Sequence, residues 1–262
     1  MKSEKSFPFY KYQGTGNDFV LLDNRDLQFP KQDVGLINKM CDRRYGIGAD
    51  GLILLENDKV SDFKMVYFNS DGNESTMCGN GGRCIVAFSK LLGMTNRKTV
   101  FEAIDGSHEA NISGTQIELA MQNVTSIETV RNHFFLNTGS PHHVQIVSQL
   151  DDFNVKTEGA KIRYGLYGQK GSNINFVEQI SNNTFKVRTY ERGVEDETLS
   201  CGTGVTAVAL AMFDSGKTTN TCVHIETKGG DLKVEFSYKN GSYTDVRLIG
   251  PAIEVFQGLW KE

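Results

Sequence analysis

The strongest constraint on the fold of this chain is an internal repeat with a constant spacing. Residues 78–81 (C-G-N-G) follow an acidic, polar loop and precede an apolar run, and residues 201–204 (C-G-T-G) do the same 123 positions later. A strand-like stretch that begins with Phe-Lys precedes each segment, at Phe63 and at Phe185. The order of strand, acidic loop, C-G-x-G and helix therefore occurs twice, which predicts two similar halves.

Two further landmarks repeat at the same spacing. Residues 138–140 (T-G-S) repeat residues 15–17 (T-G-N), and residues 171–173 (G-S-N) repeat residues 48–50 (G-A-D). A single matched glycine can arise by chance, but several matches at one spacing indicate that a whole unit is duplicated.

The predicted halves are residues 1–127 and 128–249, and each contains many short strand patterns and essentially two helix patterns. This composition of elements favours the α+β class, with a curved, mostly antiparallel sheet wrapped around a central helix in each half. Two copies of one unit most simply pack about a pseudo-two-fold axis. The two C-G-x-G segments are then expected to face each other across a cleft between the halves. Residues 250–262 contain a strand that is expected to pack back on the first half.

Hydrophobic spacing predicts a helix over residues 33–45, and apolar runs predict helices over residues 85–92 and 205–213. Each of the last two follows a C-G-x-G segment. The unpaired backbone N–H groups at a helix start can hold an anion, and the positive end of the helix lowers the pKa of a nearby thiol. Each cysteine is therefore a candidate for an activated thiol beside an anion site.

Composition excludes several classes of function. Of the 262 residues, 39% are hydrophobic and 23% are charged, with a net charge of −4. An acidic chain without a basic cluster is not typical of nucleic-acid binding. No apolar run reaches the length of a membrane span, and no secretory leader pattern follows the charged N-terminus, so no membrane partner is expected. Five cysteines without such a leader are typical of reduced thiols in the cytoplasm.

Two chemical roles explain the cysteines only in part. Cys78 and Cys84 are separated by five residues, whereas zinc sites favour two to four, and the five histidines show no completing spacing. No metal is therefore expected. Alternatively, one cysteine is a nucleophile with His142 as its base, but this leaves the second cysteine unexplained.

A racemase uses both cysteines. It removes a proton from one face of a carbon and returns a proton to the other face, which two thiols on opposite sides can do if one is a thiolate. The helix starts would bind the substrate carboxylate and stabilise the charge that develops as the proton leaves. No lysine stands in a setting that suggests a pyridoxal Schiff base, so no cofactor is expected.

Six motifs along nearly the whole chain resemble those of the diaminopimelate epimerase family. They are residues 14–19 (G-T-G-N-D-F), 46–50 (G-I-G-A-D), 68–72 (F-N-S-D-G), 78–84 (C-G-N-G-G-R-C), 190–193 (Y-E-R-G) and 200–204 (S-C-G-T-G). The related proline racemases usually carry His where this chain has Asn80. The phenazine-type isomerases share the fold of the family but lack its cysteines.

The resemblance implies an isomerase that interconverts LL- and meso-diaminopimelate without a cofactor, in lysine and peptidoglycan biosynthesis, as a cytoplasmic homodimer. It implies Cys78 and Cys201 as the two acid/bases. The implied substrate-binding residues are Asn17, Asn69, Gly79, Asn80, Asn173, Glu191, Arg192, Gly202 and Thr203. Supporting residues are His142, Asp50 and Ser140. Most members of the family have Asn where this chain has Ser140. The alternatives are another cofactor-independent amino-acid racemase of the same fold and a binding module without catalytic activity.

Overall fold

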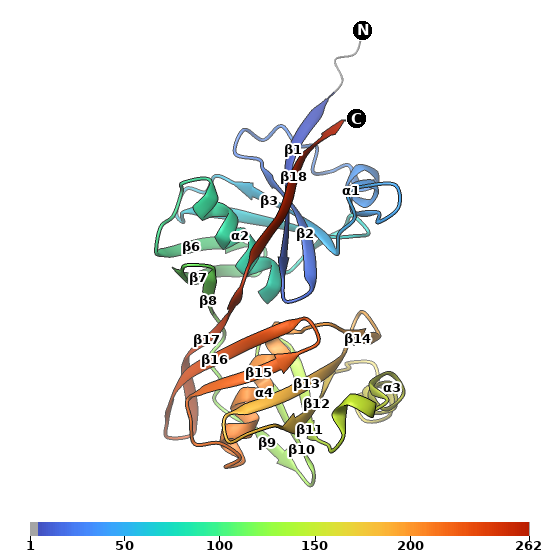
Figure 1. Cartoon of the computed structure of the whole chain (residues 1–262), viewed down its shortest axis with the longest axis vertical. Coiled ribbons are helices and arrows are strands. Elements are labelled where there is room, and N and C mark those ends of the chain that lie inside the picture. Colours follow the sequence, from blue (N-terminus) through green and yellow to red (C-terminus); the bar gives the residue numbers. More distant parts are fainter. Residues whose placement is uncertain (1–4, 262) are drawn as a thin grey trace. The chain divides into compact units, whose positions relative to one another are not determined.

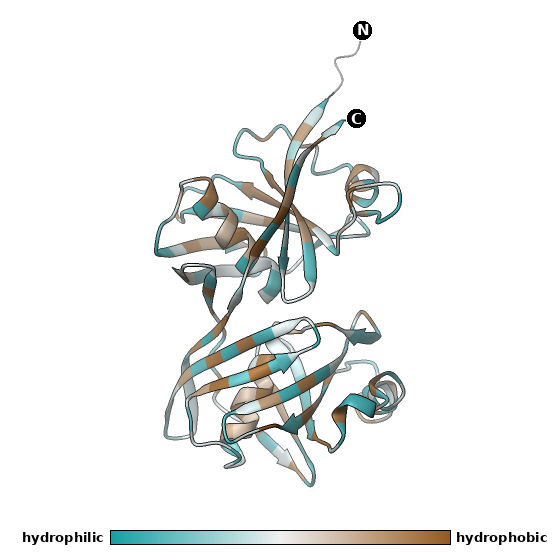
Figure 2. Cartoon of the chain, viewed as in Figure 1, coloured by the Kyte–Doolittle hydropathy of each residue, from teal (hydrophilic) through white to brown (hydrophobic). Residues whose placement is uncertain are grey.

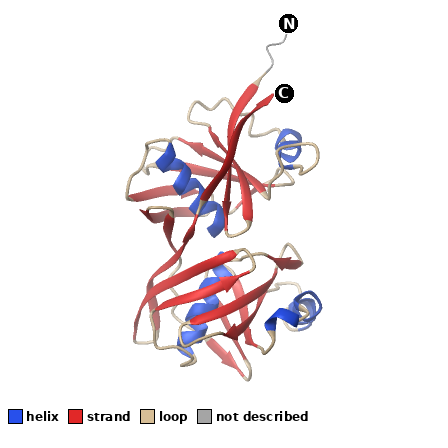
Figure 3. Ribbon diagram, viewed as in Figure 1, coloured by secondary structure: helices blue, strands red, loops and turns tan. Residues whose placement is uncertain are grey.

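The computed structural model describes residues 5–261, which divide into two compact units (Figure 1). Unit 1 comprises the residues up to Leu119 together with those from Pro251 onward, and unit 2 comprises Ala120–Gly250. Among the described residues, each unit has two α-helices and a mixed, mostly antiparallel sheet (Figure 3). The predicted α+β class with two similar halves is confirmed.

Unit 1 is built from a sheet in the order β18-β1-β2-β3-β4-β6-β7-β8, with the short β5 paired to the end of β4. The β2–β3 and β4–β6 pairs are parallel, and the other pairs are antiparallel. Figure 1 shows the C-terminal strand β18 running beside β1. The elements of unit 1 are β1 (Ser6–Gly14), β2 (Asn17–Asp23), α1 (Val34–Cys41), β3 (Gly51–Glu56), β4 (Phe63–Asn69), β5 (Glu74–Ser75), α2 (Gly79–Leu91), β6 (Lys98–Ala103), β7 (Gly106–Ser113), β8 (Gln116–Ala120) and β18 (Ile253–Lys261).

Unit 2 repeats this strand order except at one edge, where β9 directly precedes β10 in the chain, whereas β18 is the last strand of the chain. Its sheet runs β9-β10-β11-β12-β13-β15-β16-β17, with β14 paired to the end of β13, and the β11–β12 and β13–β15 pairs are parallel. The elements of unit 2 are β9 (Glu128–Val130), β10 (His133–Asn137), β11 (Pro141–Ile146), the 3-10 helix η1 (Leu150–Asp152), α3 (Val155–Gly165), β12 (Asn173–Gln179), β13 (Thr184–Glu191), β14 (Asp196–Thr198), α4 (Gly202–Asp214), β15 (Cys222–Thr227), β16 (Gly230–Lys239) and β17 (Ser242–Pro251).

The helix that follows each cysteine segment packs against the sheet of its unit. Helix α2 contacts β1, β2, β3 and β7, and α4 contacts six strands of its own unit. Helix α4 is buried almost all round, as expected of a helix that is apolar on every face. Strand β16, which contacts α4, alternates between buried and exposed residues, and Figure 2 shows hydrophobic and hydrophilic colours alternating along it.

Glycines let α2 lie close to the sheet. A Cβ added at Gly81 would lie 3.2 Å from the Ile53 side chain, and one added at Gly82 would lie 2.9 Å from the sulfur of Met77. A larger residue at either position would push the start of the helix away from the strands. The glycines after Cys78 therefore bring the helix start to the sheet.

The predicted helix bounds were wrong at three places. Helices α2 and α4 begin at Gly79 and Gly202, several residues before the apolar runs, because the cysteines themselves occupy the N-cap positions. Helix α1 ends at Cys41 rather than residue 45. The Asp42 carboxylate accepts the N–H groups of Arg44 and Tyr45 at 2.7 and 2.6 Å, which competes with continuation of the helix.

The longest α-helices in the described part of the chain have 13 residues. None of the described helices is both long and apolar enough to cross a lipid bilayer.

Candidate active site

Cys78 caps helix α2 in unit 1. Its backbone is extended, and its Sγ accepts a hydrogen bond from the N–H of Gly81 at 3.3 Å. A helix start normally uses a side-chain oxygen for this contact, so here the sulfur takes the position where negative charge is favoured. The thiol is half-buried, and Gly79 and Asn80 directly after it are buried. The arrangement suits a thiolate beside an anion-binding helix start.

A chain of amide hydrogen bonds joins three of the predicted site residues. Asn80 Nδ2 donates to Asn17 Oδ1 at 2.5 Å, and Asn17 Nδ2 donates to Asp50 Oδ2 at 2.9 Å. Asn80 Oδ1 in turn accepts from the guanidinium of Arg83 at 3.0 Å. A guanidinium at one end and a carboxylate at the other fix the direction of both amides. Residues far apart in the sequence are thereby held together at the start of α2.

The tight turn before Asn17 is strained. Thr15 and Gly16 have φ values of 52° and 93°, and the pair Gly14↔Asn17 closes a two-residue hairpin between β1 and β2. A β-branched residue rarely adopts a positive φ. The Thr15 hydroxyl accepts from Arg83 at 2.9 Å, which helps to hold this conformation. Arg83 thus supports the turn that presents Asn17.

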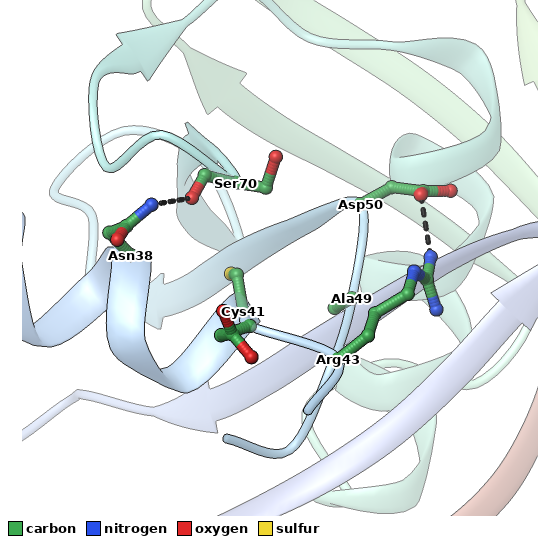
Figure 4. Close-up of a pocket in the computed structure, with 7 residues that line it drawn as sticks. Asn38, Cys41, Arg43, Ala49, Asp50 and Ser70 are labelled. Atoms are coloured by element: carbon green, nitrogen blue, oxygen red, sulfur yellow. Dashed lines mark hydrogen bonds and ion pairs between the residues drawn. The ribbon is translucent and has the colours of Figure 1, made fainter. Parts of the chain in front are cut away.

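Charged residues hold the other end of the amide chain. Arg43 donates to Asp50 at 2.7 Å and to Asp18 at 2.6 Å, and Lys11 forms an ion pair with Asp18 at 2.8 Å. Burial disfavours the Asp18 carboxylate, but the hydrogen bonds from Arg43 and Lys11 outweigh it and lower the pKa of Asp18 to about 2. Figure 4 shows Arg43 reaching Asp50 at the wall of a cavity of about 280 Å³.

Cys201 caps helix α4 in unit 2 in a different setting. It is 8% exposed, and its Sγ lies 3.5 Å from the hydroxyl of Thr203. The hydroxyl of Thr138 donates to the backbone carbonyl of Thr203 at 2.8 Å. Hydroxyl groups therefore contact both the sulfur and the first turn of this helix.

His142 lies under the start of α4. Its ring contacts the side-chain amides of Asn173 and Asn175, with Nδ1 lying 3.2 Å from Asn175 Nδ2. The Asn175 Oδ1 lies 2.4 Å from where a Cβ of Gly204 would be, so this glycine allows the amide to reach the helix. Complete burial, assisted by the charge of Arg192, lowers the pKa of His142 to about 3. The imidazole is neutral and serves as a hydrogen-bonding support.

Glu191 is the last residue of strand β13, and Arg192 follows it beside Asn173. The Asn173 Oδ1 accepts from the backbone N–H of Arg192 at 2.8 Å. The Arg192 guanidinium is exposed and donates to the carbonyl of Lys170 at 3.0 Å. Burial raises the pKa of Glu191. An exposed guanidinium is thus held next to a half-buried carboxyl by the backbone.

Two predicted residues lie at the margins of these clusters. Asn69 is exposed at the end of β4, paired with Gly51 of β3, and Ser140 is half-buried in the turn before β11. Three contributors were not predicted as site residues: Thr15, Arg83 and Asn175. Thr15 and Arg83 lie inside the family-like motifs of residues 14–19 and 78–84, so the sequence could have pointed to them as site residues. Asn175 lies within a strand and outside every motif, so nothing in the sequence pointed to it.

Comparison with known proteins identifies the group to which this arrangement belongs. The sequence model of the family described as diaminopimelate epimerase matches residues 9–126 and 134–252, one match for each half. The chain belongs to the diaminopimelate epimerase family. It is 62% identical over 250 residues to the diaminopimelate epimerase of Flavobacterium psychrophilum, covering 95% of this chain and 98% of that protein. The corresponding protein of Chlorobaculum tepidum is 43% identical, with 94% and 98% covered.

More distant solved structures share the fold of this epimerase-family chain. A phenazine biosynthesis protein of the PhzF family from Bacillus anthracis superposes with a TM-score of 0.74 at 15% identity, covering 98% of this chain and 99% of that one. A hydroxyproline epimerase from Agrobacterium vitis gives 0.69 at 12% identity, with 100% and 94% covered. The predicted resemblance to the epimerase family is confirmed, and the enzyme is an isomerase.

The neutral state of His142 predicts a pH dependence of stability. The pKa of about 3 in the folded chain lies below the ordinary 6.5, so the His142 contribution is full above pH 6.5 and is lost as the pH falls from 6.5 towards 3. His142→Gln should reduce the slope of the unfolding free energy against pH in this range by up to about 1.4 kcal/mol per pH unit. Urea unfolding between pH 4.5 and 7 measures this slope.

The matched control is His224→Gln, at a half-buried position of β15. An unchanged slope in His142→Gln would show that His142 does not titrate in the unfolding reaction.

Proposed function

We propose that this isomerase interconverts LL-2,6-diaminopimelate and meso-2,6-diaminopimelate without a cofactor. The membership in the family and the 62% identity over nearly the whole chain support this substrate. The observation that carries the chemistry is that each unit places a cysteine at the N-cap of a helix that packs on its sheet. Such an enzyme would serve lysine and peptidoglycan biosynthesis.

The proposed mechanism uses two bases. The predicted halves, residues 1–127 and 128–249, each supply one acid/base group, Cys78 and Cys201. A thiolate removes the α-proton and becomes a thiol, and the electron pair left on carbon delocalises into the α-carboxylate. The other thiol then gives its proton to the opposite face of the carbon and becomes the thiolate. Backbone N–H groups of Gly79, Asn80, Gly202 and Thr203 would stabilise the charge on the carboxylate.

The remaining site residues are proposed to recognise the rest of the substrate. Diaminopimelate carries two carboxylates and two ammonium groups, which require donors and acceptors of both signs. Arg192 offers a planar pair of donors for the distal carboxylate, and Glu191 offers an acceptor for an ammonium group. Amides supply further contacts, at Asn17, Asn69 and Asn173, with Asp50, Ser140 and His142 in support.

The two-base mechanism predicts that both thiols are required for inversion. Cys78→Ala and Cys201→Ala should each lose about 10²–10⁴-fold or more in epimerisation of LL-diaminopimelate, because no acid remains on one face. Each variant should still exchange the α-hydrogen slowly on its intact face, which proton NMR in heavy water detects. Cys222→Ala, a half-buried thiol on β15, is the control and should keep its activity. Inversion at the parent rate in either of the first two variants would exclude the mechanism.

A second prediction concerns substrate selection. Arg192→Lys should lower kcat/KM for diaminopimelate by at least about tenfold, since an ammonium cannot replace the two-pronged contact of a guanidinium. Arg131→Lys, which changes an exposed arginine in the β9–β10 turn, should leave kcat/KM unchanged. Equal values for both variants would remove Arg192 from the binding site.

We also propose a cytoplasmic homodimer. Five cysteines in a chain of this size favour a reducing compartment, and finding the protein oxidised in cell extracts would oppose the assignment. A surface for dimerisation is offered by β18, which among the described residues pairs only with β1 and exposes Val255, Phe256 and Leu259 by about half. An apolar edge strand of this kind is suited to pairing with a second chain.

The dimer proposal predicts that a charge on this edge shifts the mass in solution. Val255→Lys should convert a dimer to a monomer in light scattering, because lysine on an edge strand opposes pairing between strands. Val60→Lys alters a residue that is 94% exposed outside the strands and should leave the mass unchanged. A monomeric parent chain would contradict the proposal.

A further inference from the structure

Arg83 is a buried cation that the two-base mechanism has not used. It lies in the second turn of α2 with 0% of its surface exposed, and its guanidinium donates only to neutral oxygens. These acceptors are the carbonyls of Gly79 and Pro251, the hydroxyl of Thr15 and the amide oxygen of Asn80. Among the described residues, no carboxylate forms an ion pair with it. Burying a charge without a counter-charge lowers the stability of the folded chain, so a functional role for Arg83 is expected.

Arg83 donates to the carbonyl of Gly79, the residue directly after Cys78, and its charge acts on the thiols of Cys84 and Cys78. Complete burial raises the pKa of Cys84 well above its ordinary range, so Cys84 stays a neutral thiol. Cys78 is only half-buried, and its sulfur already accepts the N–H of Gly81. Cys78 is therefore the group that can take the negative charge opposite Arg83.

Other charged groups near this helix start are already paired. Asp18 is held by Lys11 and Arg43. Asp105 accepts from the backbone of Met77 and from His108, each at 3.3 Å. From β1, Tyr12 lies near Cys84 and near the carboxylate of Glu254 on β18. Burial and the charge of Glu254 raise the pKa of Tyr12, so its phenol stays neutral. Arg83 is connected to Asp50 through the side-chain amides of Asn80 and Asn17, and Asp50 itself forms an ion pair with Arg43.

Unit 2 lacks this cation. The repeat spacing of 123 residues puts Thr206 where unit 1 has Arg83. Both side chains donate to the first helical residue: Arg83 to the carbonyl of Gly79 at 3.3 Å, and Thr206 to the carbonyl of Gly202 at 3.0 Å.

The rest of the amide chain is neutral in unit 2 as well. By the same spacing, Asn80, Asn17 and Asp50 correspond to Thr203, Ser140 and Asn173. His142, which supports the start of α4, has a pKa of about 3 and is uncharged at neutral pH. Unit 1 therefore has a fully buried positive charge at its helix start, whereas Arg192, the cation whose charge reaches His142 in unit 2, is exposed to solvent.

We propose that Arg83 is a positioning residue that makes Cys78, and not Cys201, the thiolate of the resting enzyme. The proposal rests on the two-thiol function proposed above and specifies which of the two cysteines is deprotonated before substrate binds. Cys78 takes the α-proton of the isomer whose hydrogen faces it, while the Cys201 thiol delivers its proton to the other face. Arg83 also holds Asn80 and the Thr15 turn, so the same side chain sets both the charge and the position of the carboxylate-binding groups.

The test measures each thiol separately in the resting enzyme. The rate of iodoacetamide alkylation at Cys78 and at Cys201 is followed by peptide mass spectrometry between pH 5 and 10, without substrate. In the parent enzyme Cys78 should reach half of its maximal rate at a lower pH than Cys201. In Arg83→Gln the Cys78 midpoint should rise by about 1–3 pH units, while the Cys201 midpoint stays in place.

Two further variants separate charge from structure. Arg83→Lys keeps the positive charge with fewer hydrogen bonds. The pH midpoint of Cys78 alkylation in this variant should therefore stay close to that of the parent, even if turnover falls. Arg25→Gln removes one positive charge at an exposed site and should leave both midpoints unchanged. Circular dichroism checks that each variant is folded, and if Arg83→Gln is not, the order of the Cys78 and Cys201 midpoints in the parent enzyme still decides.

The outcomes are distinct from those that test the overall function. A Cys78 midpoint that is unmoved in Arg83→Gln, or lost to the same degree in Arg83→Lys, would overturn the proposal. A parent enzyme in which Cys201 is the more acidic thiol would overturn it too. If LL-diaminopimelate is not converted but the Cys78 midpoint depends on Arg83, the substrate assignment fails while the role of Arg83 stands.

Discussion

The contact on which this structure depends is that between a cysteine sulfur and the start of the helix it caps. In unit 1 the Sγ of Cys78 accepts the N–H of Gly81 where most helices use an oxygen. The contact requires the helix start to lie against the sheet, which the glycines after the cysteine permit. The thiol, the anion-binding N–H groups and the neighbouring amides are thereby gathered within one turn of helix.

The second requirement is that polar groups around a buried helix start be satisfied. Unit 1 does this with charges at both ends of an amide chain, from Arg83 through Asn80 and Asn17 to Asp50. Unit 2 does it with neutral groups, the hydroxyls of Thr203 and Thr206 and the amides around His142. The duplicated fold thus keeps most of its strand order while the polar contacts around its two cysteines differ, which suits the opposite protonation states that the proposed mechanism requires.

The strained Thr15 turn shows how these requirements interact. A positive φ at a β-branched residue is unfavourable by itself, but the turn delivers Asn17 to the amide chain and Thr15 to Arg83. Local strain is offset here by contacts with residues more than sixty positions away. This is a tertiary effect that local propensity opposes.

The sequence by itself determined the duplication, the α+β class and the two cysteine segments, because the spacing of motifs and the period of hydrophobic residues can be measured directly along the chain. It did not determine that the helices start at the glycines, because the N-cap role of a cysteine depends on how closely the helix approaches its sheet. Nor did it determine the roles of Arg83 and Asn175. The sequence does not distinguish a buried arginine from a surface arginine. Only tertiary packing decides whether a guanidinium contacts water or, as in Arg83, the hydroxyl of a distant turn. Burial likewise decided that His142 is a neutral support, since the pKa of an imidazole follows the solvent that packing leaves around it.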